Sequence, residues 1–116
     1  MLSTTDRKEA IRKFKEQKPR RGIFVVRCSS TGDAWVGSSI NLDAAKNRFW
    51  FSLRLQVHQD RTLQAAWDQH GEGAFQYEVL ELLDDDVSQY DIAGLLKEKR
   101  AVWIEKLSAR AVVGAY

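Results

Sequence analysis

Residues 22–28 constrain the fold of this chain more than any other segment. The four residues from Ile23 to Val26 are β-branched or aromatic, and they are apolar at both alternating positions. A strand with one exposed face would alternate apolar and polar residues, so this strand is expected to be buried on both sides. The sequence therefore predicts a central strand with other elements covering both of its faces.

Two further strands are predicted around the central one. Residues 29–33, Ser-Ser-Thr-Gly-Asp, are turn formers, and a second strand begins at residues 34–37. Two strands joined by about five residues form an antiparallel hairpin. Residues 75–80 alternate between apolar and polar side chains, which predicts the third strand.

Helices account for most of the remaining chain. Asn41 is expected to cap one helix, and Ser88 with Asp91 to open the last one. The expected segments are residues 6–17, 42–54 and 62–70, and a long final helix with a buried stripe from Ile92 to Leu107. The 116 residues fit one domain. The sequence thus predicts an α+β fold, namely a small three-stranded antiparallel sheet flanked by helices, with an extra N-terminal helix.

Cysteine content and hydropathy indicate the compartment. The single cysteine, Cys28, excludes a disulfide framework and a cysteine-based zinc cluster, and it fits a reducing cytosol. The chain becomes charged from Asp6 onward, before the apolar stretch of a secretory signal could form. No apolar run approaches the ~20 residues that span a bilayer. We therefore expect a cytoplasmic protein with no membrane partner.

The positive charge of the chain is concentrated at its N-terminus. Residues 1–21 contain eight basic and three acidic residues, a net charge of +5, whereas the remaining 95 residues carry −3. This asymmetry favours a solvated helix with a basic surface, and a phosphate-rich partner is the alternative.

Short motifs follow one another in a set order through residues 22–107. They are Gly22-Ile23-Phe24, Trp35-Val36-Gly37-Ser38-Ser39, Asn41-Leu42, Leu53-Arg54 with His58, the segment from Leu63 to Gly71, the segment from Phe75 to Glu81, and Trp103-Ile104. Their order and spacing resemble the GIY-YIG nuclease superfamily, in particular its homing-endonuclease-like domains. The resemblance implies a GIY-YIG-like domain over residues 22–116, with residues 1–21 as a basic N-terminal helical extension.

Members of that superfamily cleave phosphodiester bonds with a divalent metal ion, and the resemblance implies where their catalytic groups would lie. One tyrosine position falls on Phe24 and another on Trp35. The position of the phosphate-binding arginine falls on Ala45, and that of a His or Tyr one turn later falls on Phe49. The position of the metal-binding glutamate falls on Arg100.

These substitutions remove groups that the reaction needs. Phe24 has no hydroxyl, and the indole N–H of Trp35 donates a hydrogen bond but cannot act as a base. Arg100 places a cation where a metal ion would bind. His58 alone is retained among the polar positions. The scaffold is therefore expected to be kept while the active site is degenerate.

Three replacements for the missing groups remain open. Arg48 lies one turn beyond Ala45, about 60° around the helix, and its long side chain could reach the same phosphate. Glu98 could ligate a metal ion if the register of the last helix were shifted. Tyr77 or Glu78 on the third strand could supply an oxygen.

A nucleic-acid-binding surface is expected independently of catalysis. Basic residues gather on or beside the helix over residues 42–54 and in the N-terminal segment. They are Lys46, Arg48, Arg54, Arg61, Lys13, Arg20 and Arg21. Exposed members of the aromatic run 49–51 would stack on bases, although at least two of the three are expected in the core.

The favoured function is that of a GIY-YIG-superfamily domain that interacts with nucleic acid, DNA rather than RNA. Its phosphodiesterase site is expected to be degenerate, weakly active or inactive, without a cofactor. One alternative is an active metal-dependent endonuclease that uses Arg48 and Glu98 with Mg²⁺ or Mn²⁺. Another is a protein-interaction module in which Phe24, Trp35 and Phe49 have made the former cleft apolar. Packing of these aromatic side chains into a closed core would count against the endonuclease.

Overall fold

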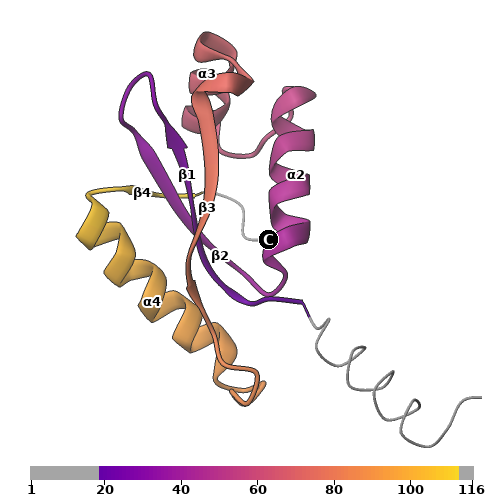
Figure 1. Ribbon diagram of the computed structural model, residues 1–116, viewed down its shortest axis with the longest axis vertical. Coiled ribbons are helices and arrows are strands. Elements are labelled where there is room, and N and C mark those ends of the chain that lie inside the picture. Colours follow the sequence, from indigo (N-terminus) through magenta and orange to yellow (C-terminus); the bar gives the residue numbers. More distant parts are fainter. Residues whose placement is uncertain (1–18, 113–116) are drawn as a thin grey trace, which may run out of the picture.

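The computed structural model describes residues 19–112, in which helices cover both faces of a four-stranded sheet (Figure 1). The predicted N-terminal helix over residues 6–17 lies outside the described residues. The strands are β1 (Gly22–Cys28), β2 (Ala34–Ser39), β3 (Phe75–Leu82) and β4 (Arg110–Ala111), in the order β3-β1-β2-β4. The helices are α2 (Leu42–Arg54), α3 (Arg61–His70), the short 3-10 helix η1 (Glu72–Ala74) and α4 (Ile92–Leu107).

Strand β1 is central, as predicted. It pairs antiparallel with β2 on one side and with β3 on the other. The side chains from Ile23 to Val26 are all buried, because the two faces of β1 contribute to different cores. Phe24 and Val26 pack on the face covered by α2 and α3, whereas Ile23 and Val25 pack on the face covered by α4.

The sheet differs from the prediction at its edge. Instead of three antiparallel strands, it has a fourth, two-residue strand that pairs parallel to β2. The backbone N–H of Val112 continues this pairing by donating to the carbonyl of Val36 (2.9 Å). So short a strand has no alternating pattern, and its pairing partner lies more than 70 residues earlier in the chain. The sheet is therefore mixed.

The helix boundaries mostly agree with the prediction. Helix α2 covers residues 42–54, and the side chain of Asn41 accepts a hydrogen bond from the N–H of Ala44 (3.1 Å). The start of α4 differs, because Asp91 makes no side-chain capping bond. Its backbone is already in the helical region, so its carboxylate is not aimed at the first N–H groups. Instead, the N–H of Asp91 donates to the carbonyl of Ser88 (2.9 Å) in a turn that precedes the helix. No helix within residues 19–112 combines the length and apolar character needed to cross a membrane.

Candidate functional site

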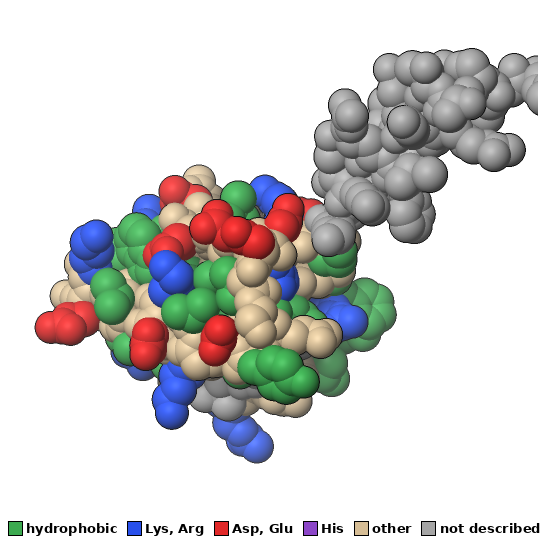
Figure 2. Space-filling view, turned by 90° about the horizontal axis from the view of Figure 1, so that it is seen from below, with side chains coloured by type: hydrophobic (Ala, Val, Ile, Leu, Met, Phe, Trp, Pro, Cys, Tyr) green, Lys and Arg blue, Asp and Glu red, His purple; other side chains and the backbone are tan. Residues whose placement is uncertain are grey.

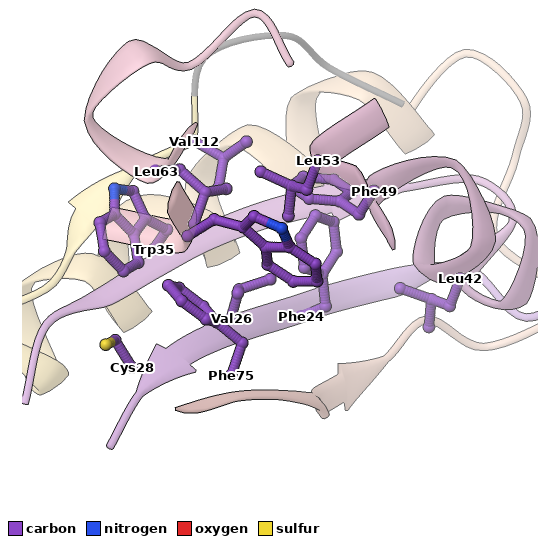
Figure 3. Close-up of a cluster of buried hydrophobic side chains, with 11 residues drawn as sticks. Phe24, Val26, Cys28, Trp35, Leu42, Phe49, Leu53, Leu63, Phe75 and Val112 are labelled. Atoms are coloured by element: carbon purple, nitrogen blue, oxygen red, sulfur yellow. The ribbon is translucent and has the colours of Figure 1, made fainter. Parts of the chain in front are cut away.

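Four of the five positions at which the sequence resemblance predicts the family's catalytic groups lie in the hydrophobic core. Phe24, Trp35 and Ala45 are 1% exposed, and Phe49 is fully buried. The close-up in Figure 3 shows Phe24, Trp35 and Phe49 among other buried side chains between the sheet and the helices. The ring centroids of Phe24 and Phe49 are 5.2 Å apart, edge to face. We call the rings of Phe24, Trp35 and Phe49 the aromatic core.

The packing around Phe24 is close because the neighbouring strand has a glycine, without a side chain, beside its ring. The ring of Phe24 lies over Gly37 of β2, where a Cβ atom would be 2.5 Å from the Cζ atom of the ring. The face of the ring stacks on Tyr77 with a centroid separation of 5.1 Å. The Phe24 ring is thus enclosed by strand backbone and by two further rings.

Trp35 is held by a chain of hydrogen bonds. Its indole N–H donates to the hydroxyl oxygen of Thr62 (3.0 Å), and that hydroxyl donates to the carboxylate of Asp60 (2.6 Å). The same carboxylate caps α3 by accepting from the N–H groups of Thr62 and Leu63, both at 3.1 Å. The chain of bonds therefore fixes the start of α3 to strand β2.

His58, the retained polar position, belongs to the same buried network. Its Nδ1 atom accepts a hydrogen bond from the N–H of Asp60 (3.0 Å), so the neutral ring carries its proton on Nε2. Its ring packs 4.7 Å from that of Phe49. Burial lowers the pKa of His58, against the opposing attraction of the Asp60 carboxylate. The ring is therefore favoured in its neutral form.

The two oxygen-bearing residues proposed on the third strand have other partners. The hydroxyl of Tyr77 donates to the backbone carbonyl of Leu42 (2.9 Å), and burial raises the pKa of this tyrosine. Glu78 is exposed and forms an ion pair with Arg27 of β1 (3.4 Å). Tyr77 thus ties β3 to the start of α2.

Arg100, at the position predicted for the family's metal ligand, lies on α4. It lines a surface hollow of about 340 Å³ together with Lys97, Ser38 and Ser39. No carboxylate lines this hollow among the described residues, and its two cations do not fit a divalent metal ion. Within residues 19–112, no group of three or more His, Cys, Asp or Glu side chains is arranged to hold a metal ion.

Arg48 and Glu98, the proposed shifted replacements, are both exposed and lie on different helices. Arg48 is on α2, which packs on the Phe24 face of the sheet, and Glu98 is on α4, which packs on the opposite face (Figure 1). Glu98 lines a hollow of about 330 Å³ with Tyr90 and Asp91. The structure does not bring Arg48 and Glu98 together.

The predicted nucleic-acid-binding residues fall into two groups, and Lys13 lies outside the described residues. In the first group, Arg20 pairs with Asp43 (2.6 Å), Arg54 pairs with Glu72 (2.5 Å), and Arg21 donates to the carbonyl of Asp84 (2.9 Å). The second group is Lys46, Arg48 and Arg61, which are exposed and form no ion pair within residues 19–112. The second group therefore keeps its positive charge at the surface.

The buried network of Asp60 and Thr62 was not predicted from the sequence. An acidic residue directly before a helix is the usual signal of an N-cap, and Asp60 precedes α3 in this way. The bond from Thr62 to Trp35 joins residues 27 positions apart. Local sequence patterns carry no signal for such a contact.

Neither known protein-family profiles nor curated proteins match this chain. Solved structures of other proteins do match this chain. The catalytic domain of the homing endonuclease I-TevI superposes with a TM-score of 0.68 and 21% identity over 81% of this chain and 99% of that domain. A point mutant of the catalytic domain of intron endonuclease I-TevI gives a TM-score of 0.65 and 22% identity, over 77% and 84% of the two chains. At this identity, the likeness is one of fold.

Proposed function

We propose, from the GIY-YIG fold that this chain shares with the I-TevI catalytic domain, that it binds nucleic acid, and DNA in particular, without hydrolysing it. The observation that carries the proposal is the burial of Phe24, Trp35, Ala45 and Phe49. General acid–base catalysis needs a proton-transferring group within hydrogen-bond reach of the substrate. These four side chains have no such group facing solvent.

The surface charge supports binding. Lys46, Arg48 and Arg61 lie on or beside α2 without a neutralising carboxylate among the described residues. Residues 1–21 add a net charge of +5 in the sequence. Lysine and arginine side chains bind the phosphate backbone without regard to base sequence, so weak and salt-dependent binding is expected.

Fluorescence anisotropy with a labelled DNA duplex tests the binding. The double variant Lys46→Glu, Arg48→Glu reverses two charges on α2. The slope of log affinity against log salt should fall in magnitude by about 0.9 for each phosphate that the variant no longer neutralises. The matched control, Lys97→Glu with Arg110→Glu, reverses two exposed charges on other elements and should leave the slope unchanged.

Failure of the wild-type chain to bind DNA at low salt would contradict the proposal. An equal decrease of the slope in both double variants would assign the binding to net charge alone and not to α2.

One observation favours a protein-interaction module as the second candidate. An apolar groove of about 550 Å³ runs beside α4, with Ile40, Ile92 and Leu96 among its lining residues. Figure 2 shows hydrophobic side chains exposed between acidic and basic ones on the face seen from below. This candidate would be favoured if the chain bound no DNA and if an added apolar peptide protected Ile40 from solvent.

A further inference from the structure

The three consecutive aromatic residues of α2 have different surroundings. Phe49 is fully buried in the aromatic core, and Trp50 packs against Trp67 with ring centroids 5.6 Å apart. Phe51 is 64% exposed, although it is a large apolar side chain in the middle of a well-formed helix. Core packing therefore explains two of the three rings and leaves the third without a structural role among the described residues.

Cations flank the exposed ring. Arg48 and Arg54 lie three residues before and after Phe51, which places them one turn away on either side along the exposed face of α2. Leu55 at the end of α2 is 55% exposed one turn beyond Phe51. Lys46 is exposed on the same helix but lies about 140° around its axis from Phe51, so it does not share this face. We call Arg48, Phe51, Arg54 and Leu55 the α2 surface.

Two carboxylates lie near the α2 surface, and both form ion pairs. Asp43 at the start of α2 pairs with Arg20, and Glu72 of η1 pairs with Arg54 of the surface itself. Arg48 forms no ion pair among the described residues. The α2 surface therefore keeps the positive charge of Arg48 beside an exposed aromatic ring.

A ligand that complements this surface needs a negative charge beside a flat apolar group. Single-stranded nucleic acid has this chemistry, because its unstacked bases present their faces to aromatic side chains and its phosphates bind arginine and lysine. In a duplex, the base faces are covered by neighbouring base pairs, so a ring on a convex helix meets only backbone and base edges.

We propose that Phe51 stacks on a base of single-stranded nucleic acid while Arg48 contacts a flanking phosphate. This inference rests on the nucleic-acid binding proposed above and adds the form of nucleic acid and the residue that selects it.

Equilibrium binding of the full-length chain to a fluorescein-labelled oligo-dT, and to a duplex of equal length, tests the inference. Phe51→Ala should weaken oligo-dT binding by about 5- to 150-fold, the range typical of removing one stacked base, and change duplex binding by less than about twofold. Phe51→Trp should retain oligo-dT binding, because a larger ring still stacks. Alanine favours helix, so the exposed substitution leaves the fold intact.

Tyr90→Ala is the matched control, because Tyr90 is an aromatic residue 97% exposed just before α4. It should bind oligo-dT as the wild type does. Oligo-dT binding by Phe51→Ala that is as tight as that of the wild type would overturn the inference. It would also be overturned if Phe51→Ala weakened duplex binding as much as oligo-dT binding. Competition by polyglutamate as strong as that by unlabelled oligo-dT would also overturn it, because the surface would then be a general acidic-polymer site. A wild-type chain that binds neither DNA would instead refute the proposed function itself.

Discussion

The ring of Phe24 lies so close to Gly37 of the neighbouring strand that a Cβ atom on this glycine would be 2.5 Å from Cζ of the ring. Phe49 and Tyr77 pack against the same ring, so it has little freedom to move aside. From the sequence alone, Gly37 would be expected to tolerate a larger residue, since it lies in a strand and is followed by serine. In the structure, the close approach of the Phe24 ring leaves no room for a side chain at this position.

Gly37→Ala should therefore lower the free energy of unfolding by about 1–3 kcal/mol, the usual cost of overpacking a core. The cost should be smaller when Phe24 is first replaced by Leu, whose side chain is shorter. Chemical denaturation of the two single variants and the double variant measures this coupling. Gly73→Ala is the control, since a Cβ there meets nothing within 4 Å. Additive effects of Gly37→Ala and Phe24→Leu would contradict the close contact.

The hydrogen bond from Trp35 to Thr62 should contribute to stability through its position in the buried network. A double-mutant cycle with Trp35→Phe and Thr62→Val should give a coupling free energy of about 0.5–1.5 kcal/mol. Thr62→Ser keeps the hydroxyl that accepts from Trp35 and donates to Asp60, so it should reduce stability much less than Thr62→Val. A coupling energy near zero would show that the indole N–H is equally well satisfied without Thr62.

His58 should make the stability depend on pH. Its pKa is lowered in the folded chain, whereas in the unfolded chain it is about 6.5. The unfolded state therefore binds more protons below about pH 6.5, and stability should fall as the pH is lowered from there toward the folded-state pKa. Glu72 and Glu81 have lowered pKa values, so their contributions disappear only in more acidic solution.

Urea unfolding between about pH 7.5 and 5.5 measures this dependence. His58→Asn offers an amide oxygen near the position of Nδ1 and should flatten the pH dependence in this window. The same slope in His58→Asn and the wild type would assign the dependence to other groups.

The elements of the fold could largely be predicted from the sequence, because their signals are local. The apolar run from Ile23 to Val26 indicated the central strand, and Asn41 marked the start of α2. The likeness to the I-TevI catalytic domain agrees with the GIY-YIG fold that the order of motifs implied. Strand β4 could not be predicted, because it forms only when the chain returns from α4 to pair with β2.

The candidate site was less predictable than the fold. The sequence resemblance predicted substitutions at the family's catalytic positions, but it did not predict the outward orientation of Phe51 or the inward orientation of Phe49. Three consecutive aromatic residues on a helix point in three directions, and which one faces solvent depends on the neighbouring elements. At least two of them were expected in the core; Phe49 is buried there, and Trp50 is partly buried and packs against the same core.

Metal-dependent nicking of supercoiled plasmid, at a protein concentration that saturates DNA binding, tests the central claim most directly. The double variant Arg48→Ala, Glu98→Ala supplies the background, since these are the residues proposed as shifted catalytic groups. With Mg²⁺ or Mn²⁺, the wild type should bind the plasmid and produce no nicked product above that background. Nicking by the wild type that is absent in the double variant would contradict the account, because an active site would then exist outside the aromatic core.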